Sequence, residues 1–188
     1  MKIKTQHSFK HKMVELKARV DDHNFLRKKL SSLGAEYTGN FQQTDLYFVV
    51  PEGRLKLREV KGTSTAELIY YERENIAGPK QDNAFLLRVQ ESEDLKNILK
   101  KILKPLIVIQ KVREIYRYQG TSESSNYPYI QVHLDIVKNL GKFVELEIET
   151  SEKTQEKDTE IMNNFANELG IKEEQLVEMS YSDLLSPQ

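Results

Sequence analysis

The sequence contains no cysteine, so disulfides and thiolate metal sites are excluded, and a reducing compartment is compatible with the chain. It also lacks any apolar run near the roughly 18 to 20 residues of a membrane-spanning helix. The net charge is only −1, from 28 basic and 29 acidic residues, and gives no global reason to expect nucleic acid or a membrane as partner. Any anion must therefore be bound by local clusters of basic residues.

The length of 188 residues is enough for one domain with a substantial core. Residues 1–12 are basic but lack the apolar centre of a signal peptide. We therefore expect an N-terminal tail at residues 1–12, a single domain at residues 13–185, and a cytoplasmic protein.

Several segments alternate charged and apolar residues with the two-residue period of a β-strand. Within each segment the charged side chains share one face, because successive side chains of a strand point to opposite sides. These charged faces carry Glu15, Lys17 and Arg19; Arg54, Lys56 and Arg58; Lys111 and Arg113; and Glu145, Glu147 and Glu149. Asp135 precedes a turn at residues 139–141 and returns to the same face on the preceding strand.

The remaining patterns predict further strands and three helices. The expected strands are residues 13–20, 36–50, 54–60, 65–73, 85–89, 106–118, 127–137 and 142–150. Helices are expected from an N-cap at Asp21 or Asp22 to about residue 33, from a cap at Ser92 to about residue 103, and from about residue 154 to Gly170. Leu95, Ile98, Leu99 and Ile102 form the expected buried stripe of the second helix. A short tail with Tyr181, Leu184 and Leu185 is expected to pack on the sheet.

No helix regularly connects successive strands, so the pattern indicates an antiparallel α+β fold. If the helices cover the apolar faces, the charged faces turn away from them. Two arrangements remain open at this point: an open sheet with a solvated charged side, or a closed barrel with a polar interior. About eight strands are enough to close a barrel and remove its edges.

A charged interior needs a ligand that uses both signs of charge. Arginines and lysines bind phosphates, and carboxylates bind the hard divalent cations that accompany phosphates. The pattern therefore points to a polyphosphate with Mg²⁺ or Mn²⁺. The alternative is that each basic residue makes an internal salt bridge to one of the carboxylates.

At these residues the chain resembles the CYTH superfamily of triphosphate tunnel metalloenzymes, which includes class IV adenylate cyclases and thiamine triphosphatases. The resemblance rests on Val14-Glu15-Leu16-Lys17, Asp45-Leu46-Tyr47-Phe48, Gly53-Arg54-Leu55-Lys56-Leu57-Arg58-Glu59, Lys111-Val112-Arg113-Glu114-Ile115-Tyr116, residues 134–147 and Ser180-Tyr181-Ser182-Asp183-Leu184-Leu185. It implies a closed eight-stranded antiparallel β-barrel, a tunnel with helices packed outside.

The resemblance also implies roles for individual residues. The substrate phosphates would be bound by Lys17, Arg54, Lys56, Arg58, Lys111, Arg113 and Arg73, with Arg19 as a further candidate. The metal ligands would be Glu15, Asp135, Glu145 and Glu147. The catalytic set would be Glu15, Lys17, Arg58 and Glu145. His133 shares its strand face with Asp135 and could also face the tunnel.

One residue departs from the family pattern. The first strand of the family carries Glu-x-Glu-x-Lys, and Met13 stands here at the first glutamate position. A thioether is a poor ligand for a hard cation. Either the second metal site is weakened, or this branch uses a different ligand, or catalysis is lost while anion binding remains.

Three functions follow from this resemblance. The leading hypothesis is an adenylate cyclase-like lyase that converts ATP to cyclic AMP and pyrophosphate. The alternative is a triphosphatase for tripolyphosphate, thiamine triphosphate or a nucleoside triphosphate, and the third is a non-catalytic polyphosphate-binding module. We expect a small triphosphate as partner, no nucleic acid and no membrane; related tunnels are often homodimers.

Overall fold

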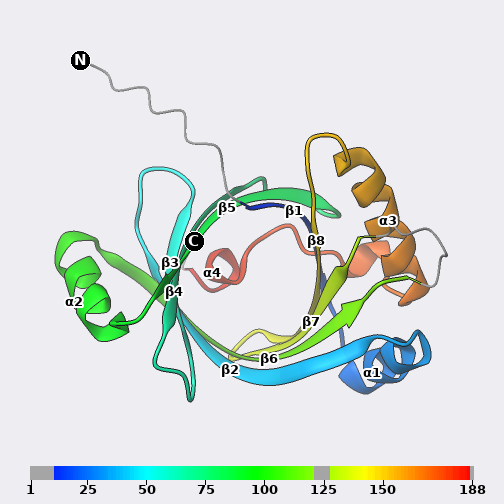
Figure 1. The fold of residues 1–188 in the computed structure, drawn as a ribbon, viewed down its shortest axis with the longest axis horizontal. Coiled ribbons are helices and arrows are strands. Elements are labelled where there is room, and N and C mark those ends of the chain that lie inside the picture. Colours follow the sequence, from blue (N-terminus) through cyan, green and yellow to red (C-terminus); the bar gives the residue numbers. More distant parts are fainter. Residues whose placement is uncertain (1–10, 121–127, 187–188) are drawn as a thin grey trace.

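The computed structural model describes residues 11–120 and 128–186. Eight antiparallel strands close into a barrel in the order β1-β5-β4-β3-β2-β6-β7-β8 (Figure 1). The strands are β1 (His11–Arg19), β2 (Glu36–Phe48), β3 (Arg54–Val60), β4 (Ala66–Arg73), β5 (Lys80–Val89), β6 (Pro105–Tyr118), β7 (Ile130–Val137) and β8 (Gly141–Glu149). The predicted closed α+β barrel is confirmed, and the open sheet is excluded.

The largest difference from the predicted strands concerns β5. It begins at Lys80 rather than near residue 85, because Gln81 and Asn83 on its outward face are polar like the inward Lys80 and Asp82, so its first half shows no alternation of polar and apolar residues. Strand β1 begins at His11, inside the segment predicted as a tail. Residue 127, predicted to begin the seventh strand, lies outside the described residues.

The helices are α1 (His23–Ser32), α2 (Ser92–Ile102), α3 (Gln155–Glu168) and α4 (Tyr181–Leu185), with a short 3₁₀ turn at Glu173–Gln175. The predicted cap of α1 is confirmed, because the Asp22 carboxylate accepts a hydrogen bond from the backbone of Asn24 at 2.8 Å. The predicted cap of α2 is wrong: Ser92 is its first helical residue, and Glu91 precedes it without a capping side chain.

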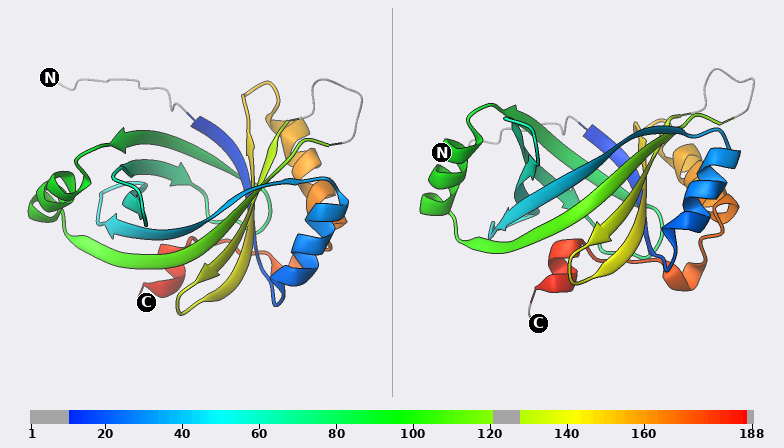
Figure 2. Two further views of the ribbon diagram at one scale, coloured as in Figure 1. Left: turned by 60° about the horizontal axis from the view of Figure 1, so that its bottom comes forward. Right: turned by 90° about the horizontal axis from the view of Figure 1, so that it is seen from below.

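Helices α1 and α3 lie together on one side of the barrel, and α2 lies at the opposite end (Figure 2). The first pair covers the outward apolar faces of β1, β7 and β8, where Leu16 and Val144 pack with Leu26 and Phe165. Only part of the predicted stripe of α2 is buried. Leu99 packs on the barrel, whereas Ile98 and Ile102 are 55% and 68% exposed, because this short helix contacts the outside of β2–β4 along one edge.

Helix α4 lies across one end of the barrel: it falls within the ring of strands in the view of Figure 1, and the side views of Figure 2 show it below the strands. Tyr181 packs edge-on against Phe143 of β8, with ring centroids 5.0 Å apart, and Leu184 and Leu185 pack against the same inner cluster. The predicted packing of this segment on the sheet is confirmed, on its inner face. None of the helices in the described ranges is long and apolar enough to cross a membrane.

Candidate functional site

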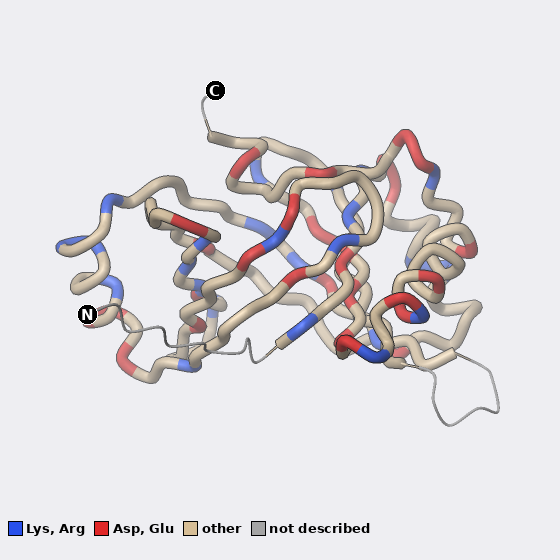
Figure 3. The backbone as a smooth tube through the Cα atoms, turned by 90° about the horizontal axis from the view of Figure 1, so that it is seen from above, with Lys and Arg blue, Asp and Glu red and all other residues tan. Residues whose placement is uncertain are grey.

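The interior of the barrel contains a cavity of about 820 Å³ lined by side chains from all eight strands. Basic and acidic residues both occur along the strands of the barrel (Figure 3). This arrangement follows from the period-two alternation, because closure turns every charged face toward one centre. The predicted site residues that line the cavity are Glu15, Lys17, Lys56, Arg58, Arg73, Lys111, Arg113, Glu145 and Glu147.

Two predicted phosphate ligands do not reach this cavity. Arg19 is exposed at the end of β1, where it donates to the Leu140 carbonyl at 2.5 Å. Arg54 forms an ion pair of 2.7 Å with Asp183 of α4 and lines a separate, smaller cavity of about 530 Å³. Both have the correct strand parity, but they lie at the end of the barrel that α4 closes. The structure therefore does not support their predicted contacts with phosphate.

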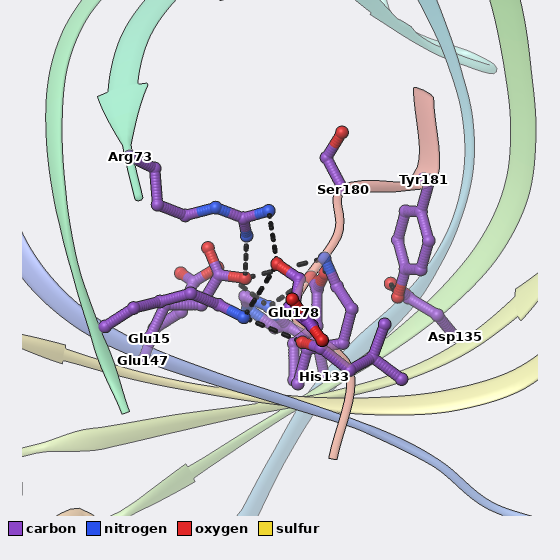
Figure 4. A network of polar contacts seen from close by, with 12 residues as sticks. Glu15, Arg73, His133, Asp135, Glu147, Glu178, Ser180 and Tyr181 are labelled. Carbon is purple, nitrogen blue, oxygen red and sulfur yellow. Dashed lines mark hydrogen bonds and ion pairs between the residues drawn. The ribbon is translucent and has the colours of Figure 1, made fainter. Parts of the chain in front are cut away.

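Asp135, a predicted metal ligand, is completely buried behind Arg113 and does not line the cavity. Its Oδ1 accepts from Arg113 Nε at 2.8 Å, and its Oδ2 accepts from Arg113 Nη2 at 2.6 Å. The Tyr181 hydroxyl also donates to Oδ2, at 2.9 Å (Figure 4). Both oxygens are thus occupied, and Asp135 orients Arg113 rather than offering a ligand atom to the cavity.

One wall of the cavity is cationic and is organised by Asp45 of β2. Its carboxylate accepts two hydrogen bonds from Arg58, at 2.8 and 2.9 Å, and lies 3.2 Å from Lys111 Nζ and 3.5 Å from Lys56 Nζ. Burial by itself would raise the pKa of Asp45, but the charges of Arg58, Lys111 and Lys56 outweigh it and hold the pKa well below its usual range. Internal salt bridges therefore exist, yet three cations share this one carboxylate.

The cationic wall holds more positive charge than its internal partners neutralise. Burial, and then the charge of Arg113, lower the pKa of Lys111 to about 7. A bound anion would favour the charged form of this lysine, because an opposite charge within a few ångströms stabilises it. The wall is thus suited to binding a multiply charged anion.

The opposite wall is acidic. Lys17 Nζ lies 2.9 Å from Glu145 and 3.5 Å from Glu15, and Arg73 donates to Glu15 at 2.6 Å (Figure 4). Glu145 also accepts a hydrogen bond from Arg113. Glu15 and Glu147 face each other directly across the β1–β8 pair, so like charges lie side by side on this wall.

His133 joins this acidic wall. Its Nδ1 lies 3.4 Å from Glu147 and 3.9 Å from Glu145, and one ligand atom of each of the three residues lies within 4.8 Å of the others. Burial alone would raise the pKa of Glu147, but the interaction with the neighbouring His133 outweighs it and lowers the pKa to about 2. The expectation that His133 faces the tunnel is confirmed.

Several buried polar atoms that lack a hydrogen-bond partner belong to residues that line the cavity, which suits the binding of a cation together with a triphosphate. Among the described residues, the buried side-chain atoms without a hydrogen-bond partner include Gln43 Oε1, Arg73 Nε, Asp82 Oδ1 and His133 Nδ1, and all four residues line the cavity. Buried polar atoms are normally paired. Carboxylate oxygens and an imidazole nitrogen are also suitable donors for a divalent cation. We therefore find that the residues fit such an ion, with Glu15, Glu145, Glu147 and His133 as its candidate ligands.

Several residues of the site were not predicted from the sequence. The motif that contains Asp45 does not by itself indicate a role for this residue, and the pattern before residue 85 predicts a loop rather than the strand that carries Asp82. Lys80 was missed for the same reason; its Nζ donates to the Val177 carbonyl at 2.7 Å and so fastens the segment before α4. The parity of Lys80, Asp82 and Ala84 was the available signal.

Comparisons with known proteins agree with this geometry. The model of the CYTH domain, a family of adenylate cyclase-like enzymes and triphosphatases that act on triphosphates with divalent metal ions, matches residues 11–181.

A protein of Methanocaldococcus jannaschii named as a candidate adenylate cyclase, MJ0240, is 29% identical over 183 residues, covering 91% of this chain and 97% of that protein. The structure of the PH1012 protein of Pyrococcus horikoshii superposes with a TM-score of 0.78 at 26% identity, over 93% of this chain and 99% of that one. The structure of HpAC1 from Hippeastrum, a candidate adenylyl cyclase described as having a dominant triphosphatase activity, superposes with a TM-score of 0.61 at 13% identity, over 93% of each chain. The chain therefore belongs to the CYTH domain family.

Proposed function

We propose that the protein is a divalent-metal-dependent enzyme that binds an organic triphosphate in its tunnel, with the conversion of ATP to cyclic AMP and pyrophosphate as its leading reaction. The observation that carries the proposal is the sharing of Asp45 by Arg58, Lys111 and Lys56. These cations face a wall of carboxylates across the same cavity. One wall then matches phosphate oxygens, and the other matches the metal ion that neutralises them.

The mouth of the cavity favours an organic triphosphate over bare tripolyphosphate. Its lining includes the apolar side chains Phe41, Val60, Leu86, Val89 and Ile115. Such side chains suit the non-phosphate part of a ligand, because apolar pocket walls with a few polar groups are typical of small-molecule sites. A nucleotide would place its phosphates among the charged residues and its base toward this mouth.

The residues of the chain have distinct roles in this proposal. Arg58 and Lys111 bind phosphate oxygens, and Arg113, oriented by Asp135, stabilises the charge that develops on the leaving pyrophosphate. Glu15 and Glu145, with Glu147 and His133, hold the divalent cation. When bound, the cation supplies charge stabilisation at the phosphates and lowers the pKa of the attacking hydroxyl.

Hydrolysis of the triphosphate is the second candidate function. It is favoured by the description of HpAC1, which shares the fold and is said to have a dominant triphosphatase activity. The MJ0240 name instead supports cyclisation. The two reactions need the same phosphate and metal ligands, and they differ in whether the nucleophile is the ribose hydroxyl or water.

Product analysis separates these functions. The purified protein would be incubated with ATP, tripolyphosphate and thiamine triphosphate, each with Mg²⁺ or Mn²⁺, and the products would be resolved by chromatography. Cyclic AMP is the expected product from ATP, and orthophosphate would support the triphosphatase instead. Tight binding without turnover of any of the three compounds would overturn the proposed enzyme and indicate a binding module.

A further inference from the structure

We propose that Asp82 of β5 supplies a carboxylate to a second divalent-cation position in the tunnel, next to Met13 and separate from the His133–Glu145–Glu147 group. This inference rests on the proposed function, since the cation would be bound together with a triphosphate. Of the three explanations for Met13 at the first glutamate position of the family pattern, it selects the second, in which this chain uses a different residue as ligand of the second metal ion.

Asp82 occupies a distinctive place in the barrel. It lines the cavity, and its residue surface is only 7% exposed. In the strand register it lies opposite Met13 on one neighbouring strand and opposite Arg73 on the other. Met13 also lies opposite Glu149 of β8, but that side chain is 78% exposed and does not line the cavity. Asp82 is therefore the cavity-lining carboxylate directly across from the position where β1 carries a thioether.

Asp82 forms no close ion pair with another described residue, and the more distant charges of Arg73 and Lys56 offset its own charge only in part. Arg73, its cross-strand neighbour, turns away and donates to Glu15 at 2.6 Å and to the Glu178 carbonyl at 3.5 Å (Figure 4). Lys80 lies on the same face of β5, but its Nζ donates to the carbonyls of Ile76, Val177 and Glu178. The Asp82 Oδ1 atom is buried without any hydrogen-bond partner. A buried, unpaired carboxylate is costly, so a cation or a proton must neutralise it.

A divalent cation fits this position. Glu15 is the diagonal neighbour of Asp82 across the β5–β1 pair, a spacing that long side chains can bridge. Burial, and then the negative charges of Glu15 and Glu147, outweigh the charges of Arg73 and Lys56 and raise the pKa of Asp82 to about 7, as expected where carboxylates converge. Two carboxylates plus substrate phosphates are a usual ligand set for Mg²⁺ or Mn²⁺. The thioether of Met13 would contribute little to binding such a hard ion.

The number of bound Mn²⁺ ions tests this inference without any turnover. Wild-type protein would be saturated with an ATP analogue that has a methylene group between the α- and β-phosphates, and bound Mn²⁺ would be counted by electron paramagnetic resonance. We expect two ions per chain in the wild type and one in Asp82→Asn. Asp94→Asn, the same change at an exposed position of α2, should keep two ions.

Moving the carboxylate across the strand pair provides a second, more specific variant. Because Met13 and Asp82 face each other, Met13→Glu in the Asp82→Asn background should restore the second ion. A merely structural role of Asp82 would not predict this rescue. Circular dichroism would verify that each variant is folded.

The outcomes separate this inference from the proposed function. A wild type that binds the analogue with one ion, or an Asp82→Asn variant that keeps two, would overturn the role of Asp82 while leaving the proposed function intact. A wild type that binds neither the analogue nor Mn²⁺ would overturn the proposed function itself.

Discussion

Arg113 is the residue whose removal should destabilise the barrel most clearly. It bonds to Asp135 through two nitrogens and also to Glu145. In Arg113→Met, Asp135 would keep only the Tyr181 hydroxyl, and Glu145 would keep the ammonium of Lys17. A completely buried carboxylate would thus lose its counterion.

The expected loss can be estimated from this geometry. Breaking a buried ion pair by removing one partner costs about 3–5 kcal/mol, a large part of the roughly 5–15 kcal/mol that stabilises a typical domain. The free energy of unfolding of such a domain falls by about 2 kcal/mol for each 1 M of urea. The urea concentration at the unfolding midpoint should therefore fall by roughly 1.5–2.5 M. Equilibrium urea unfolding, followed by circular dichroism at pH 7 without metal or triphosphate, would measure it.

Arg88→Met is the matched control. Arg88 also lies on a strand, but its side chain is 81% exposed and its nearest carboxylate, Glu67, is 3.8 Å away. Such surface pairs contribute less than about 1 kcal/mol, so the midpoint should hardly change. If Arg113→Met lost no more stability than this control, the assignment of Arg113 as the counterion of the buried carboxylates would be refuted.

Three further predictions concern the acidic and cationic walls. Glu145→Gln should reduce metal-dependent turnover on the order of 100-fold or more, because a metal ligand is lost, while triphosphate binding measured by calorimetry partly remains. Arg58→Ala should instead weaken triphosphate binding by about 10- to 100-fold, as expected for a lost charged hydrogen-bonding pair. Because Glu147 has its pKa lowered to about 2 in the folded chain, it should stabilise the fold fully above its usual pKa, about 4.3, and lose that contribution as the pH falls toward 2.

Each of these predictions has a control. Glu149→Gln, on the same strand as Glu145 but with a side chain 78% exposed, should keep full turnover; equal losses in both variants would contradict the metal assignment. Arg117→Ala changes an exposed arginine and should leave triphosphate binding unchanged. Urea unfolding of the wild type and Glu147→Gln from pH 6 to 2 should give stability differences that shrink with falling pH, by up to about 3 kcal/mol. A difference independent of pH would show that the Glu147 charge does not stabilise the fold.

Local pattern predicted most of the elements correctly. The alternation around Lys17, Lys56 and Arg113 placed these side chains on the inner faces of β1, β3 and β6, because side-chain direction in a strand depends only on parity. The same reasoning failed for the first half of β5, where Gln81 and Asn83 on the outward face are as polar as the inward Lys80 and Asp82, so no alternation is present. Parity also could not show that Arg19 lies beyond the cavity, since the position of a strand end depends on its neighbours.

Interactions between distant segments could not be predicted from pattern. Asp45 meets Arg58 through the β2–β3 register and Lys111 through the β2–β6 register. Asp135 is withdrawn from the metal ligands because Arg113 and Tyr181, from two other elements, occupy its oxygens. Such pairings depend on the strand register and on where α4 packs. Neither can be predicted from the alternation of residues within one segment.

The sequence by itself determined the composition of the two faces of each strand and the kinds of charge that would need a partner, because these properties are local and follow from a two-residue period. Only the tertiary structure decided that the charged faces enclose a common cavity, which carboxylates bind arginines and which remain unpaired. The physical reason is that barrel closure and strand register set distances between residues far apart in the chain. The neutralisation of a buried charge depends on those distances.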